Sequence, residues 1–263
     1  MRLNGKSVLV TGATGGLGQA IARRMKAEGC TLTLTGRRAD VLEPLAAELG
    51  ATSLVADLSD VDAVTRVAEA AQDTDVLVAN AGVPGGGLLD ELTVEQIDRV
   101  LDVNLRAPIM LTRLLGEHML RRGTGHVVLM SSLSGKSATP YTSMYNATKF
   151  ALRGFALGLR ADWEPRGVGV SCVNPGPIAD AGMFHDGGTK LPSWVKQRKP
   201  ADVAAGVVRA VEQNRAEVDV ADLVTRVAAT VGMLAPQTSA KISKRVGADR
   251  IARDLAESHK DKR

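Results

Sequence analysis

The sequence of 263 residues has few aromatic side chains, few cysteines and no long apolar run. Aromatic residues make up 3% of the chain, too few for a base-stacking platform, so no nucleic-acid partner is expected. Its two cysteines support neither a disulfide framework nor a cysteine metal site. The longest apolar stretch near the end, 227–235, has about nine residues, whereas a membrane span needs about 20.

The start of the chain also lacks a feature that would direct it out of the cell. Residues 1–6 lead directly into a strand-like run, without the apolar region of a signal peptide. Together with the scarcity of cysteine, this predicts a reducing compartment, the cytoplasm.

The net charge of +4 is a property of the tail and not of the whole surface. Residues 237–263 hold eight Lys or Arg and four Asp or Glu, so the remainder of the chain is neutral. A solvated helix accounts for this pattern, and an anionic partner is the alternative.

Short β-rich runs alternate with helical patterns along most of the chain. Continuously apolar runs, such as 76–79 and 127–130, are typical of strands that helices cover on both faces. The alternation predicts an α/β fold, a Rossmann-type doubly wound three-layer sandwich with a parallel sheet of about seven strands. The predicted strands are Ser7–Thr11, Thr31–Thr35, Thr52–Ala56, Asp75–Ala79, His126–Ser131, Val168–Val173 and Glu217–Val220. The predicted helices include Gly18–Glu28, Ala39–Leu49 and Val61–Ala71.

We expect one catalytic domain, 1–222, followed by a helical extension, 223–263. Within the domain, 179–199 is a long connection of the kind that forms lids or binding loops. The extension is predicted to be two helices separated at Pro236, the second with a weak apolar stripe. An interface helix, a cap over the substrate pocket and a membrane-surface segment are the three interpretations, with the membrane ranked last because acids interrupt the stripe.

A glycine-rich loop follows the first predicted strand and precedes a helix. Gly12 permits the tight turn, Gly16 lets the backbone approach a pyrophosphate, and Gly18 allows close packing of helix on strand. The helix N-terminus offers free N–H groups to phosphates. The loop therefore predicts a dinucleotide site.

The spacing of this loop, T-G-x-x-x-G-x-G, resembles that of the short-chain dehydrogenase/reductase family. The resemblance extends over residues 5 to about 213. Further matches follow in chain order: Asn80-Ala81-Gly82, Asn104 in Val103-Asn104-Leu105, Ser131-Ser132, Tyr145-Asn146-Ala147-Thr148-Lys149 and Pro175-Gly176-Pro177.

Tyr145 and Lys149 are four residues apart in a helical stretch and therefore share one face. An ammonium beside a phenol lowers the phenol's pKa from about 10 and makes it a plausible acid or base. Ser132, at the carboxyl end of a strand, can hold a substrate carbonyl oxygen.

The resemblance implies the catalytic roles. Tyr145 would protonate the carbonyl in reduction or deprotonate the alcohol in oxidation. Lys149 would lower the pKa of Tyr145 and bind the ribose, and Ser132 would polarise the carbonyl. Asn104 would hold a water in a proton relay.

The end of the second strand predicts NADP rather than NAD. Gly36 stands where an NAD enzyme places an acid, and Arg37 can meet a 2′-phosphate. Arg38 adds to this contact or points to solvent. Asp57 and Leu58 match the position that contacts adenine in the family, although an ordinary helix cap explains Asp57 nearly as well.

The remaining cofactor contacts follow from the resemblance. Ile178 would offer its backbone to the carboxamide, where Asp180 replaces the Thr common in the family. The full cofactor set is Gly12, Thr14, Gly16, Leu17, Gly18, Arg37, Arg38, Asp57, Leu58, Asn80, Gly82, Tyr145, Lys149, Pro175, Gly176 and Ile178.

The expected activity is an NADP-dependent oxidoreductase acting on a small-molecule carbonyl or secondary alcohol. A non-catalytic dinucleotide sensor or scaffold is the alternative, and a dehydratase or epimerase is a weaker one. No metal site is expected, because His126 and His185 lack suitable partners. The resemblance implies a homodimer or homotetramer.

Overall fold

The computed structural model describes residues 1–182, 196–245 and 248–258, and only the backbone of 242–245 and 248–251. The predicted loop 179–199 therefore lies mostly outside the described residues, including Met183, Phe184, His185 and Trp194.

A seven-stranded parallel sheet forms the centre of the molecule, in the order β3-β2-β1-β4-β5-β6-β7. The strands are β1 (Ser7–Thr11), β2 (Thr31–Gly36), β3 (Thr52–Val55), β4 (Val76–Ala79), β5 (Gly125–Met130), β6 (Val168–Pro175) and β7 (Glu217–Val220). The predicted sheet is confirmed, with strand ends within two residues of those expected. The strand order reverses between β1 and β4, which is where ligands bind in open α/β sheets.

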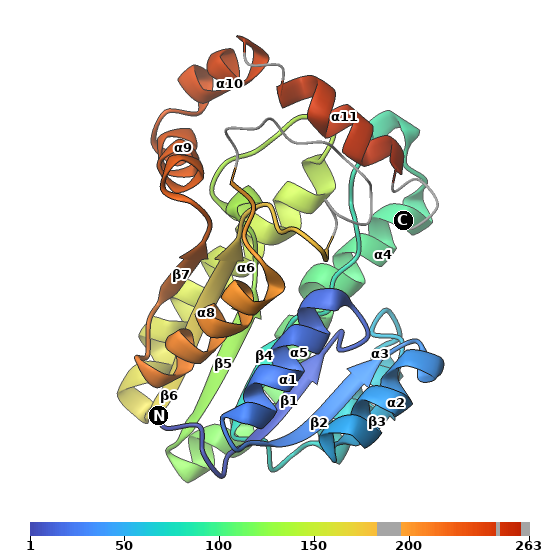
Figure 1. Ribbon diagram of the computed structural model, residues 1–263, viewed down its shortest axis with the longest axis vertical. Helices are drawn as coiled ribbons and strands as arrows, with labels where there is room; N and C mark the ends of the chain where they lie inside the picture. The colour runs from blue at the N-terminus through green and yellow to red at the C-terminus, as the bar shows by residue number, and fades with distance from the viewer. Residues whose placement is uncertain (183–195, 246–247, 259–263) are drawn as a thin grey trace.

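Helices cover both faces of this sheet, as Figure 1 shows. One apolar layer packs α1 (Gly16–Ala27), α2 (Ala39–Leu49) and α8 (Pro200–Glu212) on the sheet. The opposite layer contains α3 (Val61–Ala70), α5 (Ala107–Arg122) and α6 (Ser143–Trp163). Both layers are mostly aliphatic, as the shortage of aromatic residues requires, and the second also buries Trp163. The shorter elements are α4 (Val94–Leu101), the turns η1 (Leu89–Glu91), η3 (Leu133–Gly135) and η4 (Glu164–Arg166), and the π-helical turn η2 (Asp102–Arg106).

The carboxyl-terminal extension contains three helices where two were predicted. They are α9 (Leu223–Leu234), α10 (Pro236–Arg245) and α11 (Ala248–Ser258). The expected break at Pro236 is confirmed, because α10 begins there, and the described residues after it form α10 and α11 where one helix was predicted. Figure 1 shows the three helices as an arc beyond the carboxyl ends of the strands.

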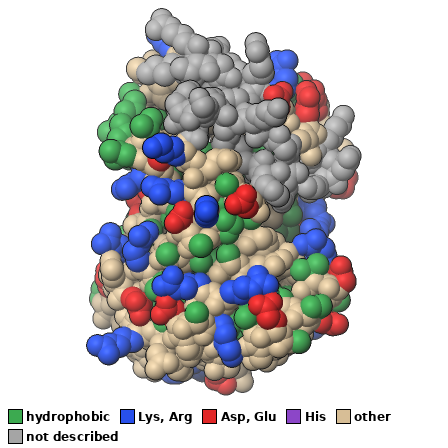
Figure 2. Space-filling view, in the orientation of Figure 1, with side chains coloured by type: hydrophobic (Ala, Val, Ile, Leu, Met, Phe, Trp, Pro, Cys, Tyr) green, Lys and Arg blue, Asp and Glu red, His purple; other side chains and the backbone are tan. Residues whose placement is uncertain are grey.

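Helix α9 presents an apolar face to the outside. Leu223 and Leu234 are 70% and 76% exposed, and Val224 and Val227 lie on the same helix. Figure 2 shows hydrophobic side chains gathered at the upper left, where α9 lies in Figure 1. Within the described ranges, no helix is both long and apolar enough to cross a membrane.

Candidate active site

The glycine loop after β1 leaves no room for side chains at its key positions. Gly12 has a positive φ of 64°, and a Cβ there would lie 2.7 Å from the Cα of Ala81. A Cβ at Gly18 would lie 2.2 Å from the carbonyl oxygen of Gly12, which explains the close packing of helix on strand. A Cβ at Gly16 would come 2.5 Å from that of Ala181, so Gly16 also makes room for the segment after β6.

Helix α1 begins at Gly16, two residues earlier than predicted. The backbone N–H groups of Gly16, Leu17 and Gly18 therefore belong to its first turn and point out of its positive end. The carbonyl of Thr14 in the same loop accepts a hydrogen bond of 2.6 Å from Arg38. This bare cradle of N–H groups suits the pyrophosphate of a dinucleotide.

Asn80, at the end of β4, holds the glycine loop in place. Its side-chain amide donates to the carbonyls of Thr11 at 2.9 Å and Gly12 at 3.3 Å. Gly82 lies close to η2 and α6, because a Cβ there would be 3.3 Å from Oδ1 of Asn104 and 3.9 Å from Nζ of Lys149. Asn80 is thus explained by its hydrogen bonds to the glycine loop, and Gly82 by the limited space beside Asn104.

A cluster of charged side chains lies beside the end of β2. Arg37 and Arg99 approach the carboxylate of Asp57 at 3.8 and 3.5 Å. A Cβ at Gly36 would lie 2.6 Å from the side chain of Thr14, so a side chain at 36 requires Thr14 to move. Arg37 is half exposed and its contact with Asp57 is long.

The carboxylate of Asp57 accepts hydrogen bonds from the backbone N–H and the hydroxyl of Ser59. Partial burial raises the pKa of Asp57, but these bonds and the nearby arginines outweigh it and hold the pKa below its ordinary value. The cap of α3 is Asp60, so Asp57 is not the helix cap that the sequence allowed as an alternative. Leu58 is buried in the apolar layer that contains α3.

Tyr145 and Lys149 lie on one face of α6 as predicted, with Nζ of Lys149 at 5.5 Å from the centre of the Tyr145 ring. Lys149 is buried and donates a 2.8 Å hydrogen bond to the carbonyl of Met130. Burial lowers the pKa of Lys149 to about 8. Burial also raises the pKa of Tyr145 to about 12, while its hydrogen bond with Ser132 acts in the opposite direction.

The direction of the Tyr145 shift differs from the sequence expectation, which was a lowered pKa. The cause is the loss of water around the ring, which penalises the phenolate. In this state Tyr145 is a neutral phenol at neutral pH, able to donate a proton.

Ser132 follows β5 and begins η3. Its hydroxyl accepts from the N–H of Ser134 at 3.1 Å and bonds Tyr145. The neighbouring Ser131 donates a 2.8 Å hydrogen bond to the carbonyl of Lys149 and so fixes α6 against the end of β5. The structure thus brings together the serine, tyrosine and lysine that lie 17 residues apart at most in the sequence.

Asn104 is fully buried in the π-helical turn η2. Its Oδ1 accepts from the N–H of Val83 at 2.7 Å, and its Nδ2 donates to the carbonyl of Val83 at 2.9 Å. The side-chain amide is therefore used to hold the loop after β4. A relay water bound at Asn104 would therefore have to bond a different atom of this residue, such as its backbone carbonyl oxygen.

The segment after β6 passes close to the glycine loop. Pro175 ends the strand, and the N–H of Gly176 bonds the carbonyl of Val220 at 3.0 Å. Ile178 is buried, and Asp180 is exposed with a positive φ of 62°. The carboxylate of Asp180 is therefore at the surface.

Comparison with known proteins identifies the family. The family model of the short chain dehydrogenases matches residues 6–191. The chain belongs to the short-chain dehydrogenase/reductase family. Members of this family bind NAD(P), and the chain is accordingly a dehydrogenase/reductase, which favours the enzyme over the scaffold alternative.

Among the relatives of this dehydrogenase is "Dehydrogenase/reductase SDR family member 7B" of Xenopus laevis, 36% identical and covering 87% of this chain and 78% of the relative. "Ketoacyl reductase HetN" of Nostoc sp. is 31% identical over 91% of this chain and 88% of its own. A solved short-chain dehydrogenase from Sphingobium yanoikuyae in complex with NADPH is 24% identical, covers 89% of this chain and 95% of its own, and superimposes with a TM-score of 0.77. That last likeness supports the fold.

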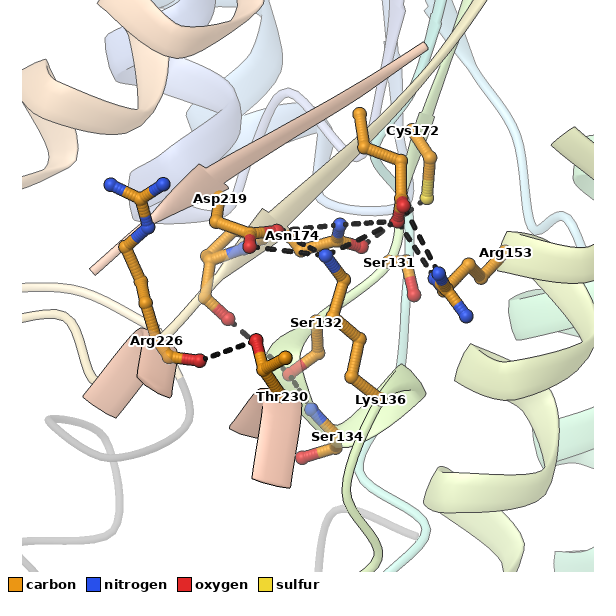
Figure 3. Close-up of polar contacts among 12 residues, drawn as sticks. Ser131, Ser132, Ser134, Lys136, Arg153, Cys172, Asn174, Asp219, Arg226 and Thr230 are labelled. Carbon is orange, nitrogen blue, oxygen red and sulfur yellow. Dashed lines mark hydrogen bonds and ion pairs between the residues drawn. The ribbon is translucent and has the colours of Figure 1, made fainter. Parts of the chain in front are cut away.

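Sequence reasoning missed a network of charged residues behind Ser132 in this dehydrogenase. Figure 3 shows Lys136, Asp219, Asn174 and Arg153 converging there. Lys136 contacts Asp219 at 2.8 Å and Glu217 at 3.4 Å, and Arg153 bonds Glu217 at 2.7 Å. The network joins η3, α6, β6 and β7, and thus connects the supports of Ser132 and Tyr145.

The histidines and cysteines do not form a second reactive site in the described parts of the dehydrogenase. His126 contacts Ser171 at 2.8 Å, and burial lowers its pKa to about 3. Cys30 and Cys172 are free and buried. Among the residues described, no group of three or more His, Cys, Asp or Glu is placed to hold a metal ion.

Proposed function

We propose that the chain is an NADP(H)-dependent oxidoreductase that transfers a hydride between the nicotinamide and a carbonyl or secondary alcohol, with Tyr145 as acid and base. The observation that supports it most is the grouping of Tyr145, Ser132 and Lys149 beside the glycine loop. Bound NADPH would supply the hydride in the reducing direction.

In reduction, Ser132 would orient the carbonyl oxygen by donating a hydrogen bond from its hydroxyl. Tyr145 would then give its phenolic proton to that oxygen. Burial keeps the phenol protonated at neutral pH, so the proton that reduction needs is present on Tyr145. In oxidation the same phenol must first lose its proton, which a nearby positive charge assists.

Lys149 would provide that positive charge. Its ammonium lies within the site and, with a pKa of about 8, is mostly protonated at neutral pH. We expect it to bind the ribose hydroxyls and, through its positive charge, to lower the pKa of Tyr145 from the value that burial alone gives. Asn104 would support the proton relay by holding Val83 and the loop after β4 in position.

The preference for NADP is proposed from the end of β2. Gly36 contributes no negative charge, and an acid introduced there would also displace Thr14. The guanidinium of Arg37 is half exposed and free to turn from its long 3.8 Å contact with Asp57 toward a 2′-phosphate. Arg38 would support the loop through the carbonyl of Thr14.

The substrate class to test first is a β-ketoacyl compound. One relative that covers most of the chain is described as a ketoacyl reductase. A ketone in such a compound presents a single carbonyl oxygen to Ser132 and Tyr145, which is the group that the site is suited to polarise and protonate.

Titration with NADPH and NADH tests the cofactor part of the proposal. NADPH is expected to bind at least about tenfold more tightly, and Arg37→Ala should remove about that factor for NADPH alone. Arg66→Ala, on the exposed side of α3, is the matched control. Equal binding of both cofactors by the wild type would refute the NADP preference but leave the enzyme assignment intact.

Substitution of Tyr145 by Phe tests the chemistry. Turnover of any accepted ketone should fall by about 10²–10⁴-fold, the usual contribution of a general acid, while NADPH binding persists. Ser132→Ala should also lose activity, and Ser134→Ala should not. Unchanged kcat in Tyr145→Phe would rule out this acid.

We also propose self-association through α6, in line with the homo-oligomer expected for the family. Phe150 and Leu157 are 40% and 37% exposed on this helix. Gly154 and Gly158 leave open space between and beside them, so the face is apolar and flat. Light scattering should give a dimer or tetramer for the wild type and a smaller species for Phe150→Glu.

A further inference from the structure

The carboxyl-terminal extension contacts both sides of the active site. On one side, α9 packs on the segment that follows Ser132: a Cβ at Gly232 would lie 2.1 Å from Oγ of Ser137. Ala229 of the same helix joins a small apolar cluster with Leu133 and Ala221. The first end of the extension is therefore attached beside Ser132.

On the other side, α11 packs on the loop after β4 and on the segment before α6. A Cβ at Gly86 would lie 3.3 Å from both Cα and Cβ of Ala256, so α11 makes van der Waals contact there. The guanidinium of Arg253 donates to the hydroxyl of Tyr141 at 2.7 and 3.1 Å and lies 5.3 Å from its ring centre. Ala252 is also buried on this helix.

The two surfaces that α11 touches are bonded directly to the start of α6. The N–H of Gly87 bonds the carbonyl of Tyr141 at 2.6 Å, and the N–H of Tyr145 bonds the carbonyl of Gly85 at 3.3 Å. Tyr141 has a positive φ of 58°, a strained conformation for a tyrosine. Only the segment around Gly86 and Tyr141 therefore separates α11 from Tyr145, the catalytic residue proposed above.

The cofactor and the extension approach the site from different directions. The cofactor cradle lies between α1, β2 and the end of β4, whereas the extension contacts Ser137 and Gly86, and its helices lie beyond α6 and α4 in Figure 1. A carbonyl compound that approached Ser132 and Tyr145 from the side of Ser137 and Gly86 would have to pass the extension.

We propose that the extension is a cap over the substrate entrance, and that α11 must separate from Gly86 and Tyr141 to admit the carbonyl substrate. This inference rests on the proposed function. Among the residues described, Ala256 and the exposed Arg253 are the contacts that join α11 to Gly86 and Tyr141, the two positions it covers beside the start of α6. Of the three interpretations of the extension, these contacts within the chain favour the cap.

A disulfide between positions 86 and 256 tests whether α11 has to move. The 3.3 Å separation is close to the Cβ–Cβ distance of natural disulfides, about 3.5–4.5 Å, so Gly86→Cys with Ala256→Cys should cross-link on oxidation. Cys30 and Cys172 are buried and should not compete. The oxidised double variant should lose at least about tenfold in kcat/KM for ketone reduction, regain it with reductant, and bind NADPH unchanged.

The two single-cysteine variants are the controls and should be insensitive to oxidant. Full activity in the cross-linked enzyme would overturn the cap, and failure to cross-link would overturn the packing of α11 on Gly86.

A second measurement does not depend on turnover. A reporter thiol is added by Ser132→Cys in the same double variant, and its rate of reaction with a bulky maleimide is measured with the cross-link closed and open. Closing should slow labelling by at least about tenfold. Equal rates would overturn the cap even if no carbonyl compound is ever turned over, whereas slowed labelling in a protein without turnover would count against the proposed function alone.

Discussion

Around the glycine loop the site is held by close backbone packing and the neutral amide of Asn80, whereas around Ser132 it is held by charged side chains. In the first region, Gly12 and Gly18 bring backbone atoms so close that no Cβ fits. In the second, Lys136 is buried between the carboxylates of Glu217 and Asp219. The two regions meet at the carboxyl edge of one sheet but differ in what keeps them in place.

This difference has physical consequences. Close backbone packing is short-ranged and carries no titratable group, so it responds to added volume and not to pH. A buried ion pair responds to the loss of either partner, because the remaining charge is left without compensation. The cofactor side should therefore be sensitive to size, and the substrate side to charge.

The largest expected effect is on the charged side. Lys136→Met leaves two carboxylates facing each other with less positive charge, and the free energy of unfolding should fall by about 3 kcal/mol or more. Urea unfolding measures this. Arg23→Met, which removes an exposed pair with Glu48 at 2.8 Å, is the control and should change stability little. Equal losses of unfolding free energy in Lys136→Met and Arg23→Met would show that the buried ion pairs of Lys136 matter no more than an exposed pair.

The second effect is on the glycine side. Gly18→Ala forces a methyl group to within 2.2 Å of the Gly12 carbonyl, and overpacking of this kind costs about 1–3 kcal/mol. Gly15→Ala is a matched control, since its Cβ would meet Gly12 at an ordinary 3.5 Å. Thermal unfolding and NADPH binding should both be impaired in the first variant and nearly normal in the second. If Gly18→Ala left both thermal stability and NADPH binding unchanged, the loop would be able to shift and accommodate the methyl group, contrary to this prediction.

The same difference explains what the sequence could reveal. The glycine loop is one local run, so its turn, its close packing and its position after β1 follow from a few neighbouring residues. Lys136, in contrast, follows a Ser-Gly pair and gives no sign of burial, because its partner Asp219 lies 83 residues further on. Networks between distant residues leave no local pattern.

Two features of the site itself could not be predicted for related reasons. The pKa of Tyr145 was expected to fall because Lys149 is near in the helix, but burial by the whole fold raises it. Asn104 was expected to hold a relay water, which stays a prediction, but no local pattern in the sequence indicated that its side chain bonds Val83, 21 residues away.

The smallest effect concerns pH. Burial raises the pKa of Glu217, but the hydrogen bond from Arg153 and the charge of Lys136 outweigh it and hold the pKa below the ordinary 4.5. A carboxyl group with a lowered pKa stabilises the fold fully above its unfolded value, and that stabilisation is lost as the pH falls through its folded value. Unfolding free energies of the wild type and Glu217→Gln should therefore differ most near neutral pH and converge below pH 4.5.

The loss of unfolding free energy in Gly18→Ala should stay constant over the same pH range, because no titratable group takes part in that contact. If the unfolding free energies of wild type and Glu217→Gln instead follow parallel curves against pH, ionisation of this carboxylate does not stabilise the fold. The expected difference in pH response between the two regions would then be absent.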